Sequence, residues 1–532
     1  MSQAQPVSFQ LLDEPWIPCE TSAGQRIELG LRQVLERAHE LSAVHDESPL
    51  VTAVLHRLLL VVLDRALSPT TREDWLRLWS AETLPAAPIE DYLASWQHRF
   101  DLFDEKRPFM QVARLEAMMT AERGKPPERQ PMSEIVMETS NFGGQVHLFA
   151  PKPADDADAG CTPAEAAKAL LVFQGYSGGG RINNETASWK SGLTRAVAVI
   201  LIRARTLRET LLLNLVWRSK RAVDDVPPWE RARDIARVDR PPAGPSDQML
   251  WPCRRAQLVP MTHHGVVAVA EAVTGAGEKF EQDVFDPLAA YVVRDPKRGP
   301  LGVRFDTDRS LWRDSAVLFE LSGDAGRRPE AVQQLAELIA EQELPPLQQL
   351  STQMLGMATD QRKVHLWRDE RLPLPNRILV DKNRVEPLRP ALALAEAVGT
   401  DFERKVLYVL CERILSPGER EAHRDDIGRL RDSLAAGPAY WAALGLAFPE
   451  WLSLLGSIDD PDDALPAWRD TVRAAVRQAF DLACRRVGTG ARAIQAVAQA
   501  EKTFGKLLYQ HGLLPPKSAA PATQTLDTGV PS

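Results

Sequence analysis

Apolar residues recur every three or four positions in several long stretches of this chain, which predicts amphipathic helices. The pattern covers residues 31–66, where leucine and valine dominate, and residues 72–100, which also carry three tryptophans. Residues 328–343 give a further amphipathic pattern. The apolar stretch 199–218 predicts a buried helix with a charged edge.

Shorter apolar runs that are separated by turn residues predict strands. Residues 9–30 are typical of two short strands around a Pro/Gly turn. Residues 251–315 contain three further runs of β type, at 266–270, 290–293 and 302–305. The N-terminal part of the chain is therefore expected to mix helices with sheet.

A polar segment at 356–363 follows the mixed polar and apolar residues 350–355 and precedes residues 364–367, and it predicts the tip of a hairpin. The tip carries Gln, Arg and Lys side chains, which are suited to insertion at a DNA groove. An ordinary charged turn would have the same residues, so both interpretations stand at this point.

The pattern changes after about residue 385, where helical periodicity continues almost to the end. Four helical stretches are separated by short breaks, and they cover 387–415, 420–435, 437–456 and 464–512. Helices joined by short links favour an antiparallel bundle.

The predicted fold class is α+β, with a large mixed N-terminal domain followed by a C-terminal antiparallel four-helix bundle. The domain boundaries are expected at 1–384 for the mixed domain and 385–515 for the bundle. Residues 516–532 are rich in Pro, Ala, Thr and Ser, which is typical of a disordered tail.

Composition narrows the class of protein. The 532 residues carry a net charge of -8, which argues against a protein that coats nucleic acid by bulk charge but leaves a local basic patch possible. Five separated cysteines without a CxxC motif indicate reduced, mostly buried thiols. The first residues lack the features of a signal peptide, and no apolar stretch is long enough to span a bilayer. We therefore expect a cytoplasmic protein with no membrane partner.

The most distinctive local feature is a triple glycine, Gly178, Gly179 and Gly180, shortly before the segment Trp189–Leu193. Three residues without a Cβ allow a backbone to approach a partner closely. Between residues 175 and 221 there are nine Lys or Arg against two acids, a local charge of about +7. A glycine loop in a positive field suits a phosphate backbone, whereas a flexible surface turn is the plain structural alternative.

Catalytic and metal-binding motifs are missing from the sequence. The nucleophile-elbow, zinc-protease and phosphate-loop patterns do not occur. His263 and His264 are adjacent, but no Cys or carboxylate cluster at ligand spacing accompanies them. We therefore expect no enzyme activity, no cofactor and no metal.

Several segments together resemble the CasA family, the large subunits of the type I-E CRISPR surveillance complex called Cascade. The similarity covers about residues 8–515 and depends on the order of its segments. These segments are Leu12–Pro18, Arg107–Gln111, the triple glycine with Lys190–Leu193, Leu207–Leu215, Leu250–Pro252 and Glu278–Phe280. Some members carry a cysteine cluster after the Trp-Pro segment, and this chain has only Cys253 there, so zinc is not expected.

The resemblance implies a role for each matching position. Gly178–Gly180 match the loop that lies against the minor groove of the protospacer-adjacent motif (PAM), and Lys279 matches a lysine that reaches into that groove. The tip formed by Asp360, Gln361, Arg362 and Lys363 matches a wedge that opens adjacent base pairs. Gln361 is the natural candidate for the wedge residue, whereas an ungapped match gives Arg362.

Two further groups of residues belong to the expected site, one from the resemblance and one from the local charge. Residues 149–153 match a mobile loop needed for PAM sensing, with Phe149 and Lys152 as its testable positions. A basic patch of Arg181, Lys190 and Arg195 accompanies the glycine loop.

The implied function is a non-catalytic, DNA-recognising subunit that starts R-loop formation. Its expected partners are other Cascade subunits, CRISPR RNA, double-stranded target DNA and a helicase-nuclease effector. Two other classes remain open: a scaffold that binds protein alone, and an α/β hydrolase or transferase. The lack of a nucleophile or metal motif counts against the enzyme, and the basic segment counts against the pure scaffold.

Overall fold

The computed structural model describes most of the chain. The described residues are 7–137, 160–180, 189–263, 265–280, 284–293, 297, 299–320, 326–345, 347, 349–360, 363–415 and 424–514. Several residues named above lie outside them, namely Phe149, Lys152, Arg181, His264, Gln361 and Arg362. The chain divides into two compact units, with the boundary between Lys382 and Asn383.

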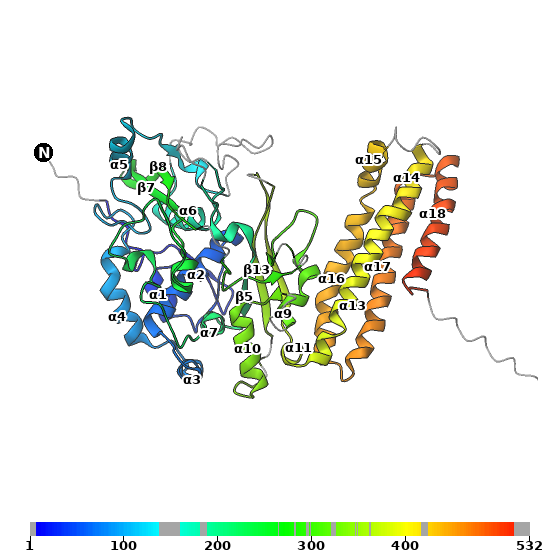
Figure 1. Cartoon of the computed structure of the whole chain (residues 1–532), viewed down its shortest axis with the longest axis horizontal. Helices are drawn as coiled ribbons and strands as arrows, with labels where there is room; N and C mark the ends of the chain where they lie inside the picture. The colour runs from blue at the N-terminus through cyan, green and yellow to red at the C-terminus, as the bar shows by residue number, and fades with distance from the viewer. Residues whose placement is uncertain are drawn as a thin grey trace, which may run out of the picture. The chain divides into compact units, whose positions relative to one another are not determined.

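Helix α2 (Pro49–Leu67) is at the centre of the first unit (Figure 1). It begins at Ser48, whose hydroxyl accepts a hydrogen bond from the Val51 amide, and a proline occupies its first turn. Nearly every residue from Leu50 to Asp64 is buried. An apolar surface on all sides of a helix requires partners on all sides, and other elements of the unit pack around it.

The elements around α2 are mostly short. The helices are α1 (Leu31–Glu36), α3 (Arg72–Ser80), α4 (Ala86–Trp96), α5 (Leu115–Arg123), α6 (Pro163–Tyr176), α7 (Leu207–Asn214), α8 (Pro245–Met249), α9 (Ala316–Phe319), α10 (Glu330–Ala340) and α11 (Asn376–Val380). Helix α12 (Lys382–Val385) spans the boundary between the units. The predicted helices over 31–66, 72–100 and 328–343 are confirmed in their main parts, but Leu41–Val44 within the first stretch is a strand.

A three-stranded sheet has the strand order β14-β13-β5 and is antiparallel throughout. Its strands are β5 (Val199–Arg203), β13 (Ser351–Asp360) and β14 (Lys363–Pro373). The prediction of a helix over 199–218 is therefore wrong in its first part. All five β5 residues are buried, so both faces of this strand are apolar, and a short continuous apolar run has no period that separates a strand from a helix.

The remaining strands form small sheets. They are β1 (Ile17–Thr21), β2 (Arg26–Leu29), β3 (Leu41–Val44), β4 (Gln130–Pro131), β6 (Val238–Asp239), β7 (Arg254–His263), β8 (Val266–Ala276), β9 (Glu278–Lys279), β10 (Tyr291–Val292), β11 (Leu301–Gly302) and β12 (Gly326–Arg327). The two strands predicted over 9–30 are confirmed as β1 and β2, and β3 joins them in the order β2-β1-β3. The strand pair β7–β8 is a long antiparallel hairpin.

The second unit is helical, as predicted. A long helix consists of α13 (Leu388–Asp401), a π-helical turn and α14 (Tyr408–Leu415). It is followed by α15 (Arg424–Leu434), α16 (Ala436–Ser457), α17 (Ala464–Arg486) and α18 (Ala491–Gln510). The fold class, a mixed unit followed by a helical one, is confirmed. In the described part of the chain, no helix combines the length and apolarity that a bilayer crossing requires.

Contacts at the helix ends give their directions. The Trp451 indole near the end of α16 donates to the Ala464 carbonyl at the start of α17 over 2.8 Å. At the other end, Arg486 of α17 donates to the Leu434 carbonyl just before α16, also over 2.8 Å. Helices α16 and α17 are therefore antiparallel. Trp468 of α17 is buried and contacts Trp451 of α16 and the Ala391 carbonyl of α13.

Candidate nucleic-acid interface

The glycine loop, Gly178–Gly180, follows the end of α6 at Tyr176. Gly180 forms an antiparallel bridge with Trp189, with both N–H···O distances at 2.8 Å. The φ of Gly180 is +125°, a conformation that residues with a Cβ rarely adopt. A Cβ on Gly179 would lie 3.0 Å from the Trp189 carbonyl oxygen, which is tighter than normal packing.

Gly178 differs from the other two glycines. A Cβ at this position would meet nothing closer than the Arg195 guanidinium, at 3.8 Å. Gly179 and Gly180 are thus explained by the fold of the loop itself, whereas Gly178 is not. A Cβ at Gly178 would make only an ordinary van der Waals contact with Arg195, so packing does not require glycine at this position.

Two buried arginines hold the loop from within the unit. The Arg254 guanidinium donates to the Gly178 carbonyl and, over 3.0 Å, to the Lys190 carbonyl, so it joins the two sides of the bridge. Arg195 donates to the Tyr176 carbonyl over 3.0 Å. Burial, with the nearby Arg254 charge, lowers the pKa of the Arg195 guanidinium. Arg195 therefore supports the loop from inside and does not belong to a surface patch, contrary to the sequence prediction.

Lys279 lies beside the same bridge. It is on β9, which pairs in parallel with β6, so that Asp239 and Lys279 are partners. The Lys279 ammonium is 5.2 Å from the centre of the Trp189 ring and 3.3 Å from the Asp239 carboxylate. The Arg237 guanidinium is 5.4 Å from the centre of the same ring. Trp189 thus brings together the glycine loop and two cations.

Further cations lie over neighbouring rings. The Lys190 ammonium is 5.7 Å from the Phe280 ring centre, and Phe280 meets Trp251 edge-on at 5.5 Å. Arg240 lies over Trp251 at 4.3 Å. Attraction to a ring face holds a cation in place without cancelling its charge. We call Gly178–Gly180, Trp189, Arg237 and Lys279 the glycine-loop surface.

A buried ion network lies on the interior side of β9. The Glu278 carboxylate, only 1% exposed, accepts hydrogen bonds from Arg231 and Arg240. The same two arginines also pair with Asp247, which is fully buried. Buried charges are tolerated when they are paired and hydrogen-bonded, so this network fixes the strand that carries Lys279.

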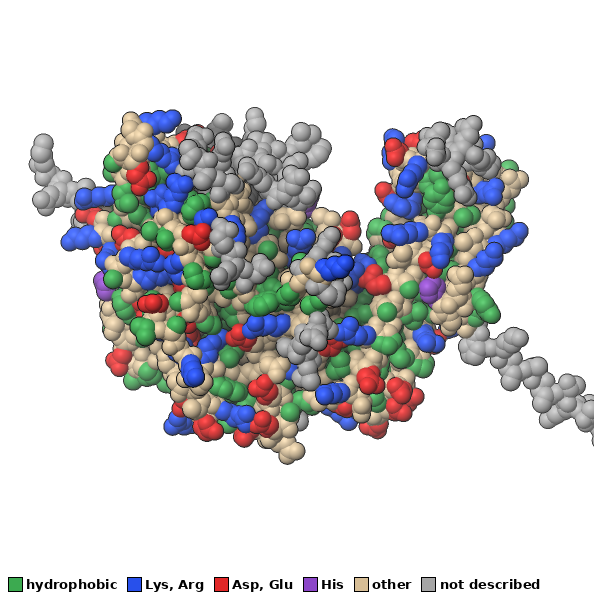
Figure 2. Space-filling model, viewed as in Figure 1, with side chains coloured by type: hydrophobic (Ala, Val, Ile, Leu, Met, Phe, Trp, Pro, Cys, Tyr) green, Lys and Arg blue, Asp and Glu red, His purple; other side chains and the backbone are tan. Residues whose placement is uncertain are grey.

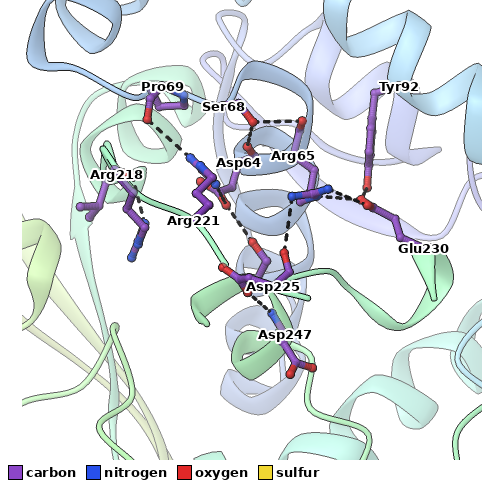
Figure 3. Close-up of polar contacts among 12 residues, drawn as sticks. Asp64, Arg65, Ser68, Pro69, Tyr92, Arg218, Arg221, Asp225, Glu230 and Asp247 are labelled. Carbon is purple, nitrogen blue, oxygen red and sulfur yellow. Dashed lines mark hydrogen bonds and ion pairs between the residues drawn. The ribbon is translucent and has the colours of Figure 1, made fainter. Parts of the chain in front are cut away.

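The segment before β6 is anchored to the end of α2 (Figure 3). Arg65 of α2 pairs with Glu230 over 2.7 Å, and the Tyr92 hydroxyl donates to the same carboxylate over 2.6 Å. The Asp225 carboxylate accepts from the Asp247 amide over 2.9 Å, and burial raises the pKa of Asp225. These contacts lie on both sides of Arg237 in sequence and hold its segment in place.

The predicted hairpin is present, since β13 and β14 pair down to Asp360 and Lys363. Gln361 and Arg362, the two candidates for the wedge residue, lie outside the described residues. Pairing of β13 with β5 ends at Leu355, whereas pairing with β14 continues to the tip. The hairpin therefore extends beyond the third strand of its sheet.

The basic segment 175–221 does not form one continuous surface. Arg203 and Arg208 are buried, Arg218 pairs with Glu330, and Arg221 pairs with Asp64. Figure 2 shows basic and acidic side chains interspersed over the visible face. The excess charge counted along the sequence is therefore dispersed by folding, and only part of it lies near the glycine loop.

Sequence reasoning gave no role to Trp189, Arg237 or Arg254. Trp189 was visible as an aromatic residue next to a lysine in a basic segment, a combination common where cations lie over rings. Nothing in the sequence pairs Arg254 with a carbonyl 76 residues away. Among the described residues, no group of three His, Cys, Asp or Glu side chains could hold a metal ion.

Comparison with known proteins gives the family. The model of the family described as CRISPR-associated protein Cse1 matches residues 10–479. The chain belongs to the CasA/Cse1 family. CasA/Cse1 of Thermus thermophilus is 35% identical over 520 residues, which cover 95% of this chain and 98% of that protein.

Solved structures of family members have the same fold. The crystal structure of Thermus thermophilus CasA matches with a TM-score of 0.80 and 33% identity, over 95% of this chain and all of that one. Cse1 of Acidimicrobium ferrooxidans matches with a TM-score of 0.75 and 24% identity, over 96% and 99% of the two chains. A chain of a CRISPR RNA-guided surveillance complex matches in fold, with a TM-score of 0.70 and 21% identity, over 94% and 100%.

Proposed function

We propose that this CasA/Cse1 family member is the large subunit of a Cascade complex and recognises the PAM from the minor groove. The observation that carries the proposal is the glycine-loop surface, in which Trp189 joins the loop to Lys279. These two elements are separated by about a hundred residues in sequence, and the family resemblance predicts DNA contact for each of them independently. The glycine loop and Lys279 both contact Trp189, which supports the proposal that they bind the same DNA element.

The chemistry of the minor groove fits this surface. Base edges there distinguish mainly A·T from G·C pairs. A backbone loop and a lysine would therefore accept several PAM sequences and reject others by shape and by the exocyclic amino group of guanine. Because phosphate contacts supply much of the affinity, such binding should fall steeply with salt.

The hairpin tip supplies the next step of the proposal. Asp360–Lys363 would insert beside the PAM and unstack the adjacent base step, which costs on the order of a few kcal/mol. Pairing of the guide RNA with the target strand compensates, because exchange of strands in an R-loop is nearly balanced. The extension of the hairpin beyond β5 supports a wedge, since its tip can enter a duplex without the third strand.

The remaining parts of the proposal concern partners. Phe149 and Lys152 would belong to a loop that senses the PAM and anchors the chain to its complex. The helical unit would contact other Cascade subunits and the displaced strand, and the chain would recruit a helicase-nuclease after R-loop formation. Sequence specificity would lie in the guide, and this chain would decide where pairing begins without catalysing a reaction.

The test is binding of target duplexes by the guide-RNA complex, reconstituted with and without this chain. A library with randomised PAM bases, at fixed salt, shows both affinity and preference. Binding that requires the chain and selects a subset of PAM sequences supports the proposal. Equal binding and equal preference without the chain would contradict it and favour a scaffold that binds protein alone.

A further inference from the structure

Trp189 occupies a central place in the glycine-loop surface. Its backbone forms both hydrogen bonds of the bridge to Gly180, and its side chain is only 8% exposed. Its indole N–H has no acceptor among the described residues. A buried tryptophan usually satisfies this group, so hydrogen bonding does not account for the position of the ring.

The ring instead contacts two cations from two different segments. Lys279 comes from β9 and Arg237 from the residues before β6, and the distances to the ring centre are nearly equal, 5.2 and 5.4 Å. The Asp239 carboxylate also pairs with Lys279. Arg237 is exposed at the surface and adds a second positive charge.

These residues are joined by their contacts. The Trp189 backbone is bridged to the glycine loop, and its ring lies against the two cations. The segment with Arg237 is itself held by the Arg65–Glu230 pair (Figure 3). One side chain therefore links the loop backbone to both cations.

We propose that Trp189 is a positioning residue that fixes Lys279 and Arg237 relative to Gly178–Gly180, and that Arg237 is a second DNA-contacting cation of this surface. The proposal rests on the function proposed above. The loop would admit the duplex backbone at close range, and the two cations would then meet phosphates or the groove edge at a set distance from it.

The first experiment compares Arg237→Ala with Arg233→Ala in the reconstituted guide-RNA complex. Arg233 is an exposed arginine of the same segment, so it controls for the loss of one charge. The probe is a target duplex with a PAM chosen from the library, and Kd is measured at salt concentrations from roughly 50 to 300 mM, on both sides of physiological ionic strength. Arg237→Ala should weaken binding about 3- to 10-fold and reduce the salt slope by about 0.9, as expected for one phosphate contact. Equal slopes for the two variants would overturn the role of Arg237.

The second experiment tests positioning by Trp189. Trp189→Phe keeps a ring face for the cations and should bind nearly as well as the natural chain, whereas Trp189→Leu removes the face and should bind more weakly. Lys279→Ala is then introduced into each background. The loss of affinity that Lys279→Ala causes should be about 2- to 5-fold smaller in the Trp189→Leu background than in the natural chain, which is the size expected for a cation–ring contact. An undiminished Lys279 effect in Trp189→Leu would overturn the positioning role.

The outcomes separate this inference from the proposed function. Binding losses for Gly178→Asp and Lys279→Ala, with none for Arg237→Ala or Trp189→Leu, would leave PAM recognition standing and reject only the inference. Unchanged binding for all four variants would reject both. Incorporation into the complex is checked by gel filtration for each variant, and the comparison of Arg237→Ala with Arg233→Ala still tests the inference if Trp189→Leu fails to assemble.

Discussion

Glu278 and Lys279 are neighbours on β9, yet they lie in opposite environments. The Glu278 carboxylate is buried and accepts hydrogen bonds from Arg231 and Arg240. The Lys279 side chain is 25% exposed and lies over the Trp189 ring. Successive side chains of a strand point to opposite faces, so one short strand separates a buried ion network from the glycine-loop surface.

Positive charges have different surroundings on the interior and surface sides of β9. In the interior, two arginines face two carboxylates, Glu278 and Asp247, and their charges are balanced. At the surface, Lys279 and Arg237 lie against an aromatic ring, and Asp239 pairs with Lys279. A ring holds a cation without neutralising it. The interior network is therefore sensitive to the loss of one partner, whereas Lys279 and Arg237 are partly or largely accessible to solvent.

The largest effect should come from removing one carboxylate of the buried ion network. Glu278→Ala leaves Arg231 and Arg240 with one carboxylate between them, and loss of one partner from a buried network costs roughly 3–5 kcal/mol. Unfolding of the full chain in denaturant should show this loss in the transition of the first unit. Lys279→Ala, one residue away, is the matched control and should cost less than about 1 kcal/mol. Similar losses of unfolding free energy for both variants would contradict the distinction between a buried side and an exposed side of β9.

The next effect concerns the approach of DNA to the loop. Gly178→Asp adds a negative charge to the loop, next to the Arg195 guanidinium, and should weaken target binding about 10-fold, because the carboxylate repels DNA phosphates and offsets the charge of Arg195. Gly178→Ala is the control, since a Cβ there meets no close atom, and it should bind within about threefold of the natural chain. Duplex binding is measured at two salt concentrations.

Gly179→Asp is a less clear test of the same idea. Its Cβ would lie 3.0 Å from the Trp189 carbonyl, so the substitution changes the loop as well as the charge. Equal binding by Gly178→Asp and Gly178→Ala would show that DNA does not approach this backbone. The glycine loop would then be a structural turn whose second and third glycines serve only the bridge to Trp189.

The sequence predicted those features that depend on local patterns. Helical periodicity predicted α10 and the C-terminal helices, and the alternation of apolar runs and turns predicted β1, β2 and the β13–β14 hairpin. It failed at β5, where Val199–Ile202 is apolar on both faces and has no period to read.

The candidate site was predictable only in its separate parts. The triple glycine and Lys279 could be named from the chain and its family resemblance. Their contact through Trp189, and the support of the loop by Arg254, depend on pairings between distant segments that no local pattern records. Charge counted along the sequence was misleading for Arg195, because counting does not distinguish a buried guanidinium from an exposed one.

An effect of similar size should follow from removing the surface cation. Lys279→Ala should weaken target binding about tenfold, the loss expected for one charged contact, and should reduce the salt slope by about 0.9. Lys279→Arg keeps the charge and should retain the slope. An unaltered slope in Lys279→Ala would mean that this lysine only packs on Trp189 and does not contact DNA.

The smallest effect is expected from the pH dependence of stability at a buried histidine elsewhere in the first unit. His56 is buried, and its Nε2 faces the Arg203 guanidinium at 3.4 Å while Nδ1 is 2.8 Å from the Thr52 carbonyl. Burial, and then the Arg203 charge, lowers the pKa of His56 from 6.5 to about 3. The folded chain thus keeps the imidazole neutral where the unfolded chain takes up a proton. The stability from this group is complete above pH 6.5 and is lost as the pH falls from 6.5 towards 3.

Between pH 6.5 and about 5.5 the loss should be about 1 kcal/mol. The measurement is the free energy of unfolding at both pH values for the natural chain and for His56→Gln, whose amide can donate to Thr52 and accept from Arg203 without titrating. The difference between the two chains should shrink or reverse by that amount at the lower pH, because only the histidine loses stability. A difference that stays constant would mean that the folded chain protonates His56 as readily as the unfolded chain does. The interior beside Arg203 would then accept a second positive charge.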